Sequence, residues 1–256
     1  ALPEPDAVEA VSRDGVAIRA WDYGGTGPAL VFCHCTGTCG RIWEPLLHCF
    51  TGDYRFIAVD ARGHGDSGKP TAREAYSWPL AGTDLLAVLD ALGLDQVMAA
   101  GHSGGATQIV TAALQRPGAF TRVVLCDAIV GPPAFFAGPN RLAAAARRRK
   151  NSFTSREDAF ERFRTRPPLA QWDDAVLRAY IDYAFEDDPD GGVRLKCPGE
   201  LEALYYEQGG LDDGFDRLGT LAMPVLLVTA ERVDIRPLVA LQRQALPGAR
   251  YVELPR

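Results

Sequence analysis

Residues 97–110 read VMAAGHSGGATQIV, and this stretch decides the fold. An apolar strand pattern runs straight into Gly101-His102-Ser103-Gly104-Gly105, and a helical pattern leaves it at once. This is the strand–turn–helix context of a nucleophile elbow. Glycines at both ends of the turn permit a close approach of strand and helix, and Gly104 leaves room beside the serine. The sequence therefore predicts Ser103 as a nucleophile at a helix N-terminus, where backbone N–H groups favour a developing anion.

Short apolar runs and helical patterns alternate on both sides of this turn. We expect strands at 8–11, 16–23, 29–33, 56–60, 96–100, 123–126, 225–229 and 250–253, and helices at 42–50, 83–92 and 105–115. Short, nearly all-apolar strands that alternate with helices indicate a mostly parallel sheet covered on both faces. The predicted fold class is α/β, with a core made of residues 1–131 and 223–256.

The alternation stops between residues 131 and 222, where the sequence is mostly helical and rich in aromatic residues. The expected helices are 140–150, 155–165, 173–185 and 200–208. We interpret 132–222 as a helical cap inserted between two strands, because a cap over a sheet edge creates an apolar cleft. Phe135 and Phe136 follow the sheet directly and are predicted to contact the substrate. Trp43 is predicted to do the same, with simple core packing as an equal alternative.

Composition and charge exclude several classes of function. The 256 residues carry 27 Lys+Arg against 33 Asp+Glu, and this net charge of −6 disfavours a nucleic-acid surface. Apolar runs stay below the ~18 residues that a membrane span needs. The first residues lack the pattern of a signal peptide, so we expect a cytoplasmic protein without a membrane partner. The basic run 147–150 is expected to be a solvated helix face, with an anionic substrate or partner as the weaker alternative.

Two motifs could indicate a cofactor or a metal site, but the sequence around each of them argues against it. Residues 63–68 fit G-x-G-x-x-G, but Pro70 prevents the helix that a dinucleotide site requires. Thiols near His34 could bind zinc, but no second pair follows at finger-like spacing; these thiols are Cys33, Cys35 and Cys39. We therefore expect no cofactor and no metal, and read the cysteines as small residues kept reduced.

Three motifs occur in the order found in one superfamily. They are residues 32–37 (FCHCTG), 60–67 (DARGHGDS) and 101–105 (GHSGG). Together with the helical insertion that follows 123–130, they resemble the α/β-hydrolase superfamily over nearly the whole chain, and its capped serine hydrolases in particular. The second motif matches the D-x-R-G-H-G-x-S loop of that superfamily. Cys35 replaces the glycine that usually follows the histidine of the first motif.

The resemblance implies a serine hydrolase that cleaves a carboxylic ester or related acyl bond of a small apolar substrate through an acyl-enzyme. The backbone N–H groups of Gly104 and Thr36, with Cys35 as the alternative to Thr36, would form the oxyanion hole. His34 would shape this loop. Ser103 argues against the dehalogenases and epoxide hydrolases of the superfamily, which use an aspartate at that position.

Two members of a catalytic triad stay open. The acid is expected at Asp234, which follows the strand 225–229, with Asp127 after 123–126 as the alternative and Glu231 as a third choice. The histidine of the superfamily follows the last strand, whereas the histidines of this chain are at positions 34, 48, 64 and 102. We therefore expect this histidine either a few residues beyond position 256 or not at all. In the second case the interpretation is a non-catalytic protein of this fold that binds a small molecule.

Overall fold

The computed structural model describes residues 3–50, 52–231 and 235–255. An eight-stranded sheet forms its centre, with the order β1-β2-β4-β3-β5-β6-β10-β11. Strand β2 pairs antiparallel with β1 and β4, and the other pairings are parallel. The mostly parallel α/β sheet predicted from the sequence is confirmed. The strands are Asp6–Val11 (β1), Ala17–Asp22 (β2), Ala29–Cys33 (β3), Arg55–Val59 (β4), Val97–His102 (β5), Phe120–Cys126 (β6), Val225–Ala230 (β10) and Arg250–Leu254 (β11).

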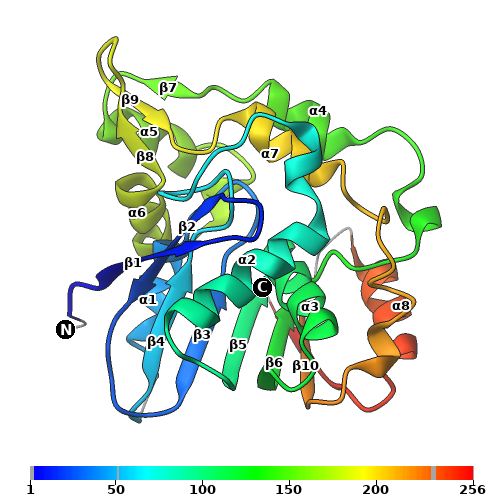
Figure 1. Ribbon diagram of the computed structural model, residues 1–256. Helices are drawn as coiled ribbons and strands as arrows, with labels where there is room; N and C mark the ends of the chain where they lie inside the picture. Colours follow the sequence, from blue (N-terminus) through cyan, green and yellow to red (C-terminus); the bar gives the residue numbers. More distant parts are fainter. Residues whose placement is uncertain (1–2, 51, 232–234, 256) are drawn as a thin grey trace.

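Alternate side chains of the central strands meet different layers of helix. In β3, Val31 belongs to the large core cluster that also contains buried residues of α2 and α3, whereas Phe32 packs with Leu47 of α1 on the opposite face. Both faces of the sheet are thus covered, as the apolar strands predicted (Figure 1). The flanking helices are α1 (Glu44–Leu47), α2 (Trp78–Ala91), α3 (Gly104–Gln115) and α8 (Arg236–Ala245). Helix α8 was not among the elements expected from the sequence.

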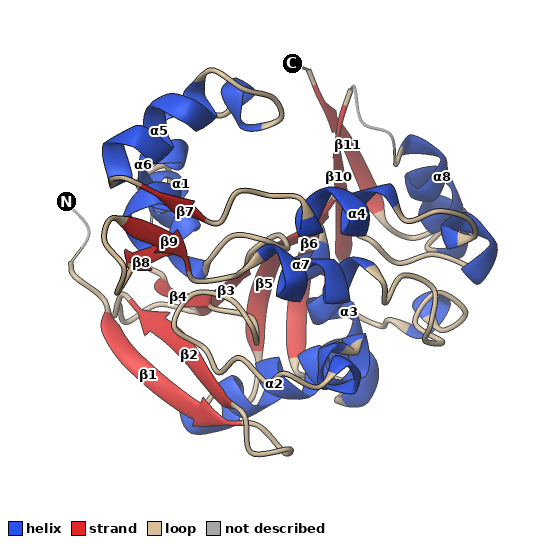
Figure 2. Ribbon diagram, turned by 90° about the horizontal axis from the view of Figure 1, so that it is seen from above, coloured by secondary structure: helices blue, strands red, loops and turns tan. Residues whose placement is uncertain are grey.

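The insertion, residues 132–222, joins β6 to β10, and its helices α4 and α7 and its three-stranded sheet lie above the sheet in Figure 1. Four of its helices were predicted, and α4 and α7 lie next to each other in Figure 2. A three-stranded sheet, β7-β9-β8, was not predicted. The helices are Arg141–Arg147 (α4), Arg156–Arg164 (α5), Asp174–Tyr183 (α6) and Gly199–Tyr206 (α7), and the strands are Ser152–Phe153 (β7), Phe185–Asp187 (β8) and Val193–Leu195 (β9). Within the described ranges, no helix combines the length and the apolar character needed to cross a membrane.

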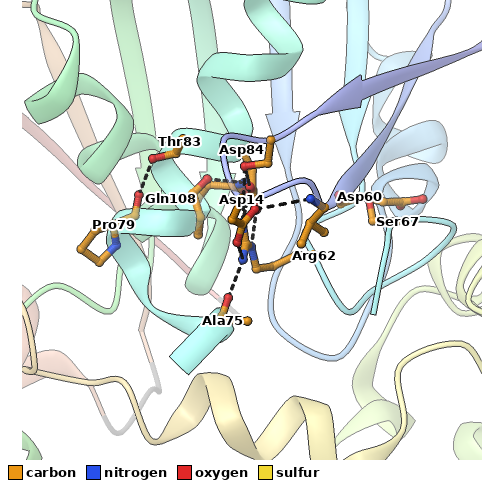
Figure 3. Close-up of polar contacts among 12 residues, drawn as sticks. Asp14, Asp60, Arg62, Ser67, Ala75, Pro79, Thr83, Asp84 and Gln108 are labelled. Atoms are coloured by element: carbon orange, nitrogen blue, oxygen red, sulfur yellow. Dashed lines mark hydrogen bonds and ion pairs between the residues drawn. The ribbon is translucent and has the colours of Figure 1, made fainter. Parts of the chain in front are cut away.

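A fully buried arginine ties the loop after β4 to α2 and to the first hairpin (Figure 3). The Arg62 guanidinium donates to both carboxylate oxygens of Asp84, at 2.5 and 2.6 Å. It also donates to Asp14 at 2.8 Å and to the Ala75 carbonyl at 2.6 Å, and the Ser12 hydroxyl donates to Asp84 at 2.5 Å. Buried charges require such partners. The cluster therefore fixes the D-x-R-G-H-G-x-S loop to the core.

Candidate active site

Ser103 occupies a sharp turn between β5 and α3, with φ 53° and ψ −117°. Positive φ is rare for a residue with a Cβ, and this ψ also lies outside the left-handed helical region, so the backbone is strained. The Ser103 N–H donates to the Cys126 carbonyl at 2.8 Å, and the Ser103 carbonyl accepts from Ala106 as α3 begins. The turn thus presents a half-buried serine at the end of the sheet, which is the geometry of a nucleophile elbow.

Glycine is required at three positions around this serine. An added Cβ would lie 2.6 Å from the carbonyl of Gly105 at position 101, and 2.3 Å from the Cys33 carbonyl oxygen at position 105. At Gly104 it would lie 2.5 Å from the Thr36 hydroxyl oxygen. These separations are far below the ~3.5 Å of ordinary contact. The first two glycines let β3, β5 and α3 approach one another, and the third brings Gly104 against Thr36.

The expected oxyanion donors lie together beside Ser103. Thr36 and Ser103 line the same cleft, and Gly104 contacts Thr36. Among the described residues, the N–H groups of Thr36 and Gly104 donate no hydrogen bond. Both are therefore free to bind a substrate oxygen, which suits the role predicted for them.

Two buried histidines hold the loop that contains Thr36. His34 Nε2 accepts from the Ala61 N–H at 3.0 Å, and His64 Nε2 accepts from the Gly37 N–H at 2.8 Å. Each ring therefore carries its proton on Nδ1, from which His34 donates to the Cys35 carbonyl and His64 to the Arg62 carbonyl. The structural role expected for His34 fits these contacts. The similar structural role of His64 was not predicted, although the motif that contains it was recognised in the sequence.

Acid should weaken this arrangement, because both rings are held neutral. Burial lowers the pKa of His34, and burial with the charge of His34 lowers the pKa of His64 to about 3. In the unfolded chain both take up protons near pH 6.5, so the free energy of unfolding falls as the pH drops below about 6.5, and the contribution of His64 continues toward pH 3. The slope is about 1.4 kcal/mol per pH unit for each histidine. Urea unfolding between pH 4 and 7 measures it.

Substitution isolates this contribution from that of the carboxylates. The His64→Gln protein should show a shallower pH slope than the wild type, because one of the two proton uptakes has been removed. His48→Gln is the matched control, since His48 is exposed and should leave the slope unchanged. Identical slopes for wild type and His64→Gln would contradict the neutral state assigned to this ring.

Asp127, one of the two expected acids, follows β6 directly, beside Ser103. The preceding residue, Cys126, accepts the Ser103 N–H. Asp127 has φ 47°, a second strained position at this end of the sheet. The Thr229 hydroxyl donates to its Oδ1 at 2.5 Å. Asp234, the acid favoured from the sequence, lies outside the described residues.

His102 and Cys35 shift each other's pKa. Burial opposes ionisation of the Cys35 thiol, but the charge of His102 lowers the pKa of the thiol overall. The same partner raises the pKa of His102 against the effect of burial. Among the described residues, no histidine is hydrogen-bonded to Ser103 Oγ. We therefore assign His102 no role as the base.

A cleft of about 590 Å³ opens beside Ser103, between the sheet and the insertion. Cys35, Thr36 and His102 contribute to its lining. The run 148–150 also lines it. Arg148 and Lys150 are exposed, in keeping with the solvated run expected from the sequence, and Arg149 is partly buried. Helix α4 ends at Arg147, three residues earlier than predicted, so these residues belong to the turn that follows rather than to a helix face. A second hollow of equal volume, beside α2, contains none of these residues.

The aromatic residues predicted to contact substrate lie outside the lining of this cleft. Phe135 and Phe136 pack edge to face, with ring centroids 5.2 Å apart, and Phe136 lies against Gly209 and Gly210. Trp43 packs on Phe32 beneath the sheet, at 5.3 Å between centroids. Other aromatic residues of the insertion form the apolar wall of the cleft instead: Phe163, Trp172 and Tyr180.

Known proteins match this chain in sequence and in fold. A curated relative, an epoxide hydrolase from Caballeronia sordidicola, is 32% identical over 171 residues, which are 65% of this chain and 49% of that protein. A 2-(acetamidomethylene)succinate hydrolase from Mesorhizobium japonicum is 36% identical over 104 residues, which are 40% of this chain and 36% of that protein. The matches thus span half or less of the length of these relatives.

The solved structures agree with the topology described above. The crystal structure of an E-2-(acetamidomethylene)succinate hydrolase has a TM-score of 0.81 at 23% identity, with 98% of this chain and 91% of that chain covered. At this identity the similarity shows the fold alone. A family model of the α/β hydrolase fold matches residues 28–232. Since that match covers most of the chain, and the strand order and the turn at Ser103 agree with it, this protein belongs to the α/β-hydrolase family.

Proposed function

We propose that this protein is a serine hydrolase that cleaves an ester or related acyl bond. The strained backbone of Ser103 carries the proposal, because a residue with a Cβ keeps φ 53° and ψ −117° where the fold requires its hydroxyl at that point. The free N–H groups of Gly104 and Thr36 support it, since they can stabilise the oxyanion of a tetrahedral intermediate. An apolar part of the substrate would pack against Phe163 and Trp172 in the cleft.

The reaction proceeds in two steps. Ser103 Oγ attacks the carbonyl carbon while a general base takes its proton, and the C–O bond to the leaving alcohol breaks as that alcohol accepts the proton. Water then attacks the ester of Ser103 by the same route and releases the acid. The base is a histidine in the superfamily that this chain resembles, and none of the four histidines printed here is placed for it.

Serine separates this chemistry from that of the relative named an epoxide hydrolase. An aspartate that opens an epoxide forms an ester, whose carbonyl water can attack. Ser103 would form an ether, which has no carbonyl and would not turn over. An acyl substrate gives Ser103 an ester that water can cleave, so the residue at this position favours acyl transfer.

Steady-state hydrolysis of 4-nitrophenyl acetate and butyrate by the full-length protein tests the proposal, with styrene oxide as the competing substrate. Ester hydrolysis that requires Ser103 supports it. Turnover of styrene oxide without ester hydrolysis would overturn it. Binding of small molecules without any turnover would favour the non-catalytic interpretation instead.

We further propose Asp127 as the acid of the triad. It adjoins Ser103 through Cys126, and Thr229 holds one carboxylate oxygen, which leaves the other to orient an imidazole. Asp127→Asn should therefore lower kcat strongly; the corresponding change costs about 10⁴-fold in another triad hydrolase. Measured beside it, Asp234→Asn should have a mild effect. The reverse pattern of kcat values would transfer the role to Asp234.

A further inference from the structure

The cleft beside Ser103 is strongly cationic, although the chain as a whole carries a net charge of −6. Five of its lining residues are basic and one, Glu202, is acidic. The basic residues come from the turn after α4 and from α5 and the turn that follows it: Arg148, Arg149, Lys150, Arg162 and Arg166. A cleft lined by one sign of charge raises the local concentration of the opposite ion. The lining therefore differs in kind from the apolar pocket expected from the sequence.

Glu202 forms an ion pair with Arg149 and with no other basic residue of the lining among the described residues. The Arg149 guanidinium donates to Glu202 Oε2 at 2.7 Å and to the Tyr180 hydroxyl. The other oxygen of Glu202 accepts from the Tyr206 hydroxyl at 3.0 Å. Among the described residues, the remaining four cations of the lining form no ion pair. Their charge is therefore available to a ligand.

Neighbouring arginines on the same elements show the contrast. Arg147, one position before Arg148, is exposed and pairs with Glu200 and Glu207. Arg164, two positions after Arg162 on α5, pairs with Glu161. These two arginines outside the lining thus have carboxylate partners, whereas Arg148 and Arg162 inside it form no ion pair with a described residue.

We propose that these cations form a subsite for an oxyanion group, a carboxylate or a phosphate, of the acyl substrate that Ser103 cleaves. Guanidinium groups match both anions through paired N–H donors. The apolar wall formed by Phe163, Leu169 and Trp172 lies in the same cleft. The substrate class is therefore a short acyl compound with the scissile carbonyl at one end and the anion at the other. This inference rests on the proposed hydrolase function and adds the substrate class to it.

Three esters of nearly equal length test the subsite: the 4-nitrophenyl esters of pentanoic, glutaric and 4-phosphonobutanoic acid. We expect the kcat/KM of an anionic ester to exceed that of the pentanoate by about tenfold or more at low salt, and the preference to shrink as salt screens the charges. A larger value for the glutarate assigns a carboxylate, and a larger value for the phosphonobutanoate assigns a phosphate. Equal values for all three esters would overturn the proposal and leave the hydrolase function standing.

Two variants locate the effect. Arg148→Gln and Arg162→Gln should each lower the ratio of anionic to neutral kcat/KM by about tenfold, the usual scale for one charge-assisted hydrogen bond. Arg164→Gln is the matched control on the same helix and should leave this ratio unchanged. Melting temperatures confirm that each variant is folded. A ratio that falls equally in Arg162→Gln and Arg164→Gln would assign the effect to overall charge and contradict a subsite.

Calorimetry with glutarate decides the matter independently of catalysis. Glutarate should bind both the wild type and Ser103→Ala, and binding should weaken about tenfold in Arg162→Gln but not in Arg164→Gln. If no ester is hydrolysed, the proposed function fails while this titration still tests the subsite. Absence of binding by both glutarate and 4-phosphonobutanoate, or equal binding by Arg162→Gln and wild type, would overturn it.

Discussion

Replacing Ser103 with alanine is expected to lower kcat for 4-nitrophenyl butyrate by at least ~10³-fold. The variant keeps the Cβ and the backbone of the turn but loses the only atom that can form the acyl-enzyme. The melting temperature should stay close to that of the wild type, because the Ser103 side chain is half-buried and its hydroxyl donates to no described residue. Steady-state rates and melting curves on the same preparation check both statements. Equal rates would remove Ser103 from the mechanism.

Glycine at the same position separates the hydroxyl from the strain. Glycine adopts φ 53° and ψ −117° without a steric penalty, whereas alanine and serine both pay it. Strain of about 1–3 kcal/mol exceeds the roughly 0.5–1 kcal/mol of chain entropy that a glycine costs. Ser103→Gly should therefore be as inactive as Ser103→Ala and have the higher melting temperature. A lower melting temperature for the glycine variant would contradict stored strain at the elbow.

Local patterns predicted the parts of the site that lie within one turn of chain. The elbow depends on glycines within two residues of Ser103. The strand before it and the helix after it have different hydrophobic periods, so both elements can be recognised in the sequence. The loop that contains Thr36 was predicted for the same reason. The hydrogen bond from this loop to His64 was not predicted, because it joins Gly37 to a residue 27 positions away.

The insertion was predicted less well, for two physical reasons. Strands β7, β8 and β9 have two or three residues each, too few to show an alternating pattern. The direction of Arg148 depends on where α4 ends, and helix ends are the least certain feature of a sequence pattern. Phe135 and Phe136 were expected near the serine because they follow the sheet in sequence, but they pack against Gly209 and Gly210.

The largest loss of stability is expected from Asp84→Asn. Arg62 and Asp84 both have fully buried side chains, and the change leaves the guanidinium without the carboxylate that accepts two of its hydrogen bonds. Removal of one partner of a buried ion pair costs about 3–5 kcal/mol. In a chain of this size that corresponds to a fall in melting temperature of roughly 6–20 °C. Calorimetric melting of the variant beside the wild type measures it.

An exposed pair of the same chemistry supplies the control. Arg116 donates to both oxygens of Asp90 at 2.7 Å, but these side chains are 36% and 60% exposed. Solvent screens such a pair, so Asp90→Asn should cost about 0–1 kcal/mol. Similar melting temperatures for the two variants would show that burial does not govern the Arg62 cluster.

The double variant Arg62→Met, Asp84→Leu tests whether the stability loss in Asp84→Asn comes from an unpaired buried charge or from lost packing. Burial raises the pKa of Asp84 even beside a guanidinium, which shows how strongly the core opposes this carboxylate. With both charges removed, no fully buried ion remains unpaired, and the protein should recover much of the stability that Asp84→Asn loses. Asp14 also loses Arg62 as its partner, but its side chain is partly exposed to solvent. The Ser12 hydroxyl then lacks its acceptor, so recovery should be incomplete.

The same cluster is connected through the backbone to the loop that contains Thr36. The Arg62 carbonyl accepts from His64 Nδ1, and His64 Nε2 in turn accepts from the Gly37 N–H. The double variant keeps this carbonyl but loses the side chain that anchors it to α2. If the anchor positions the loop, ester hydrolysis by the double variant should show a lower kcat with KM nearly unchanged, measured well below its melting temperature. A wild-type kcat in that variant would show that Arg62 contributes to stability but does not position the loop.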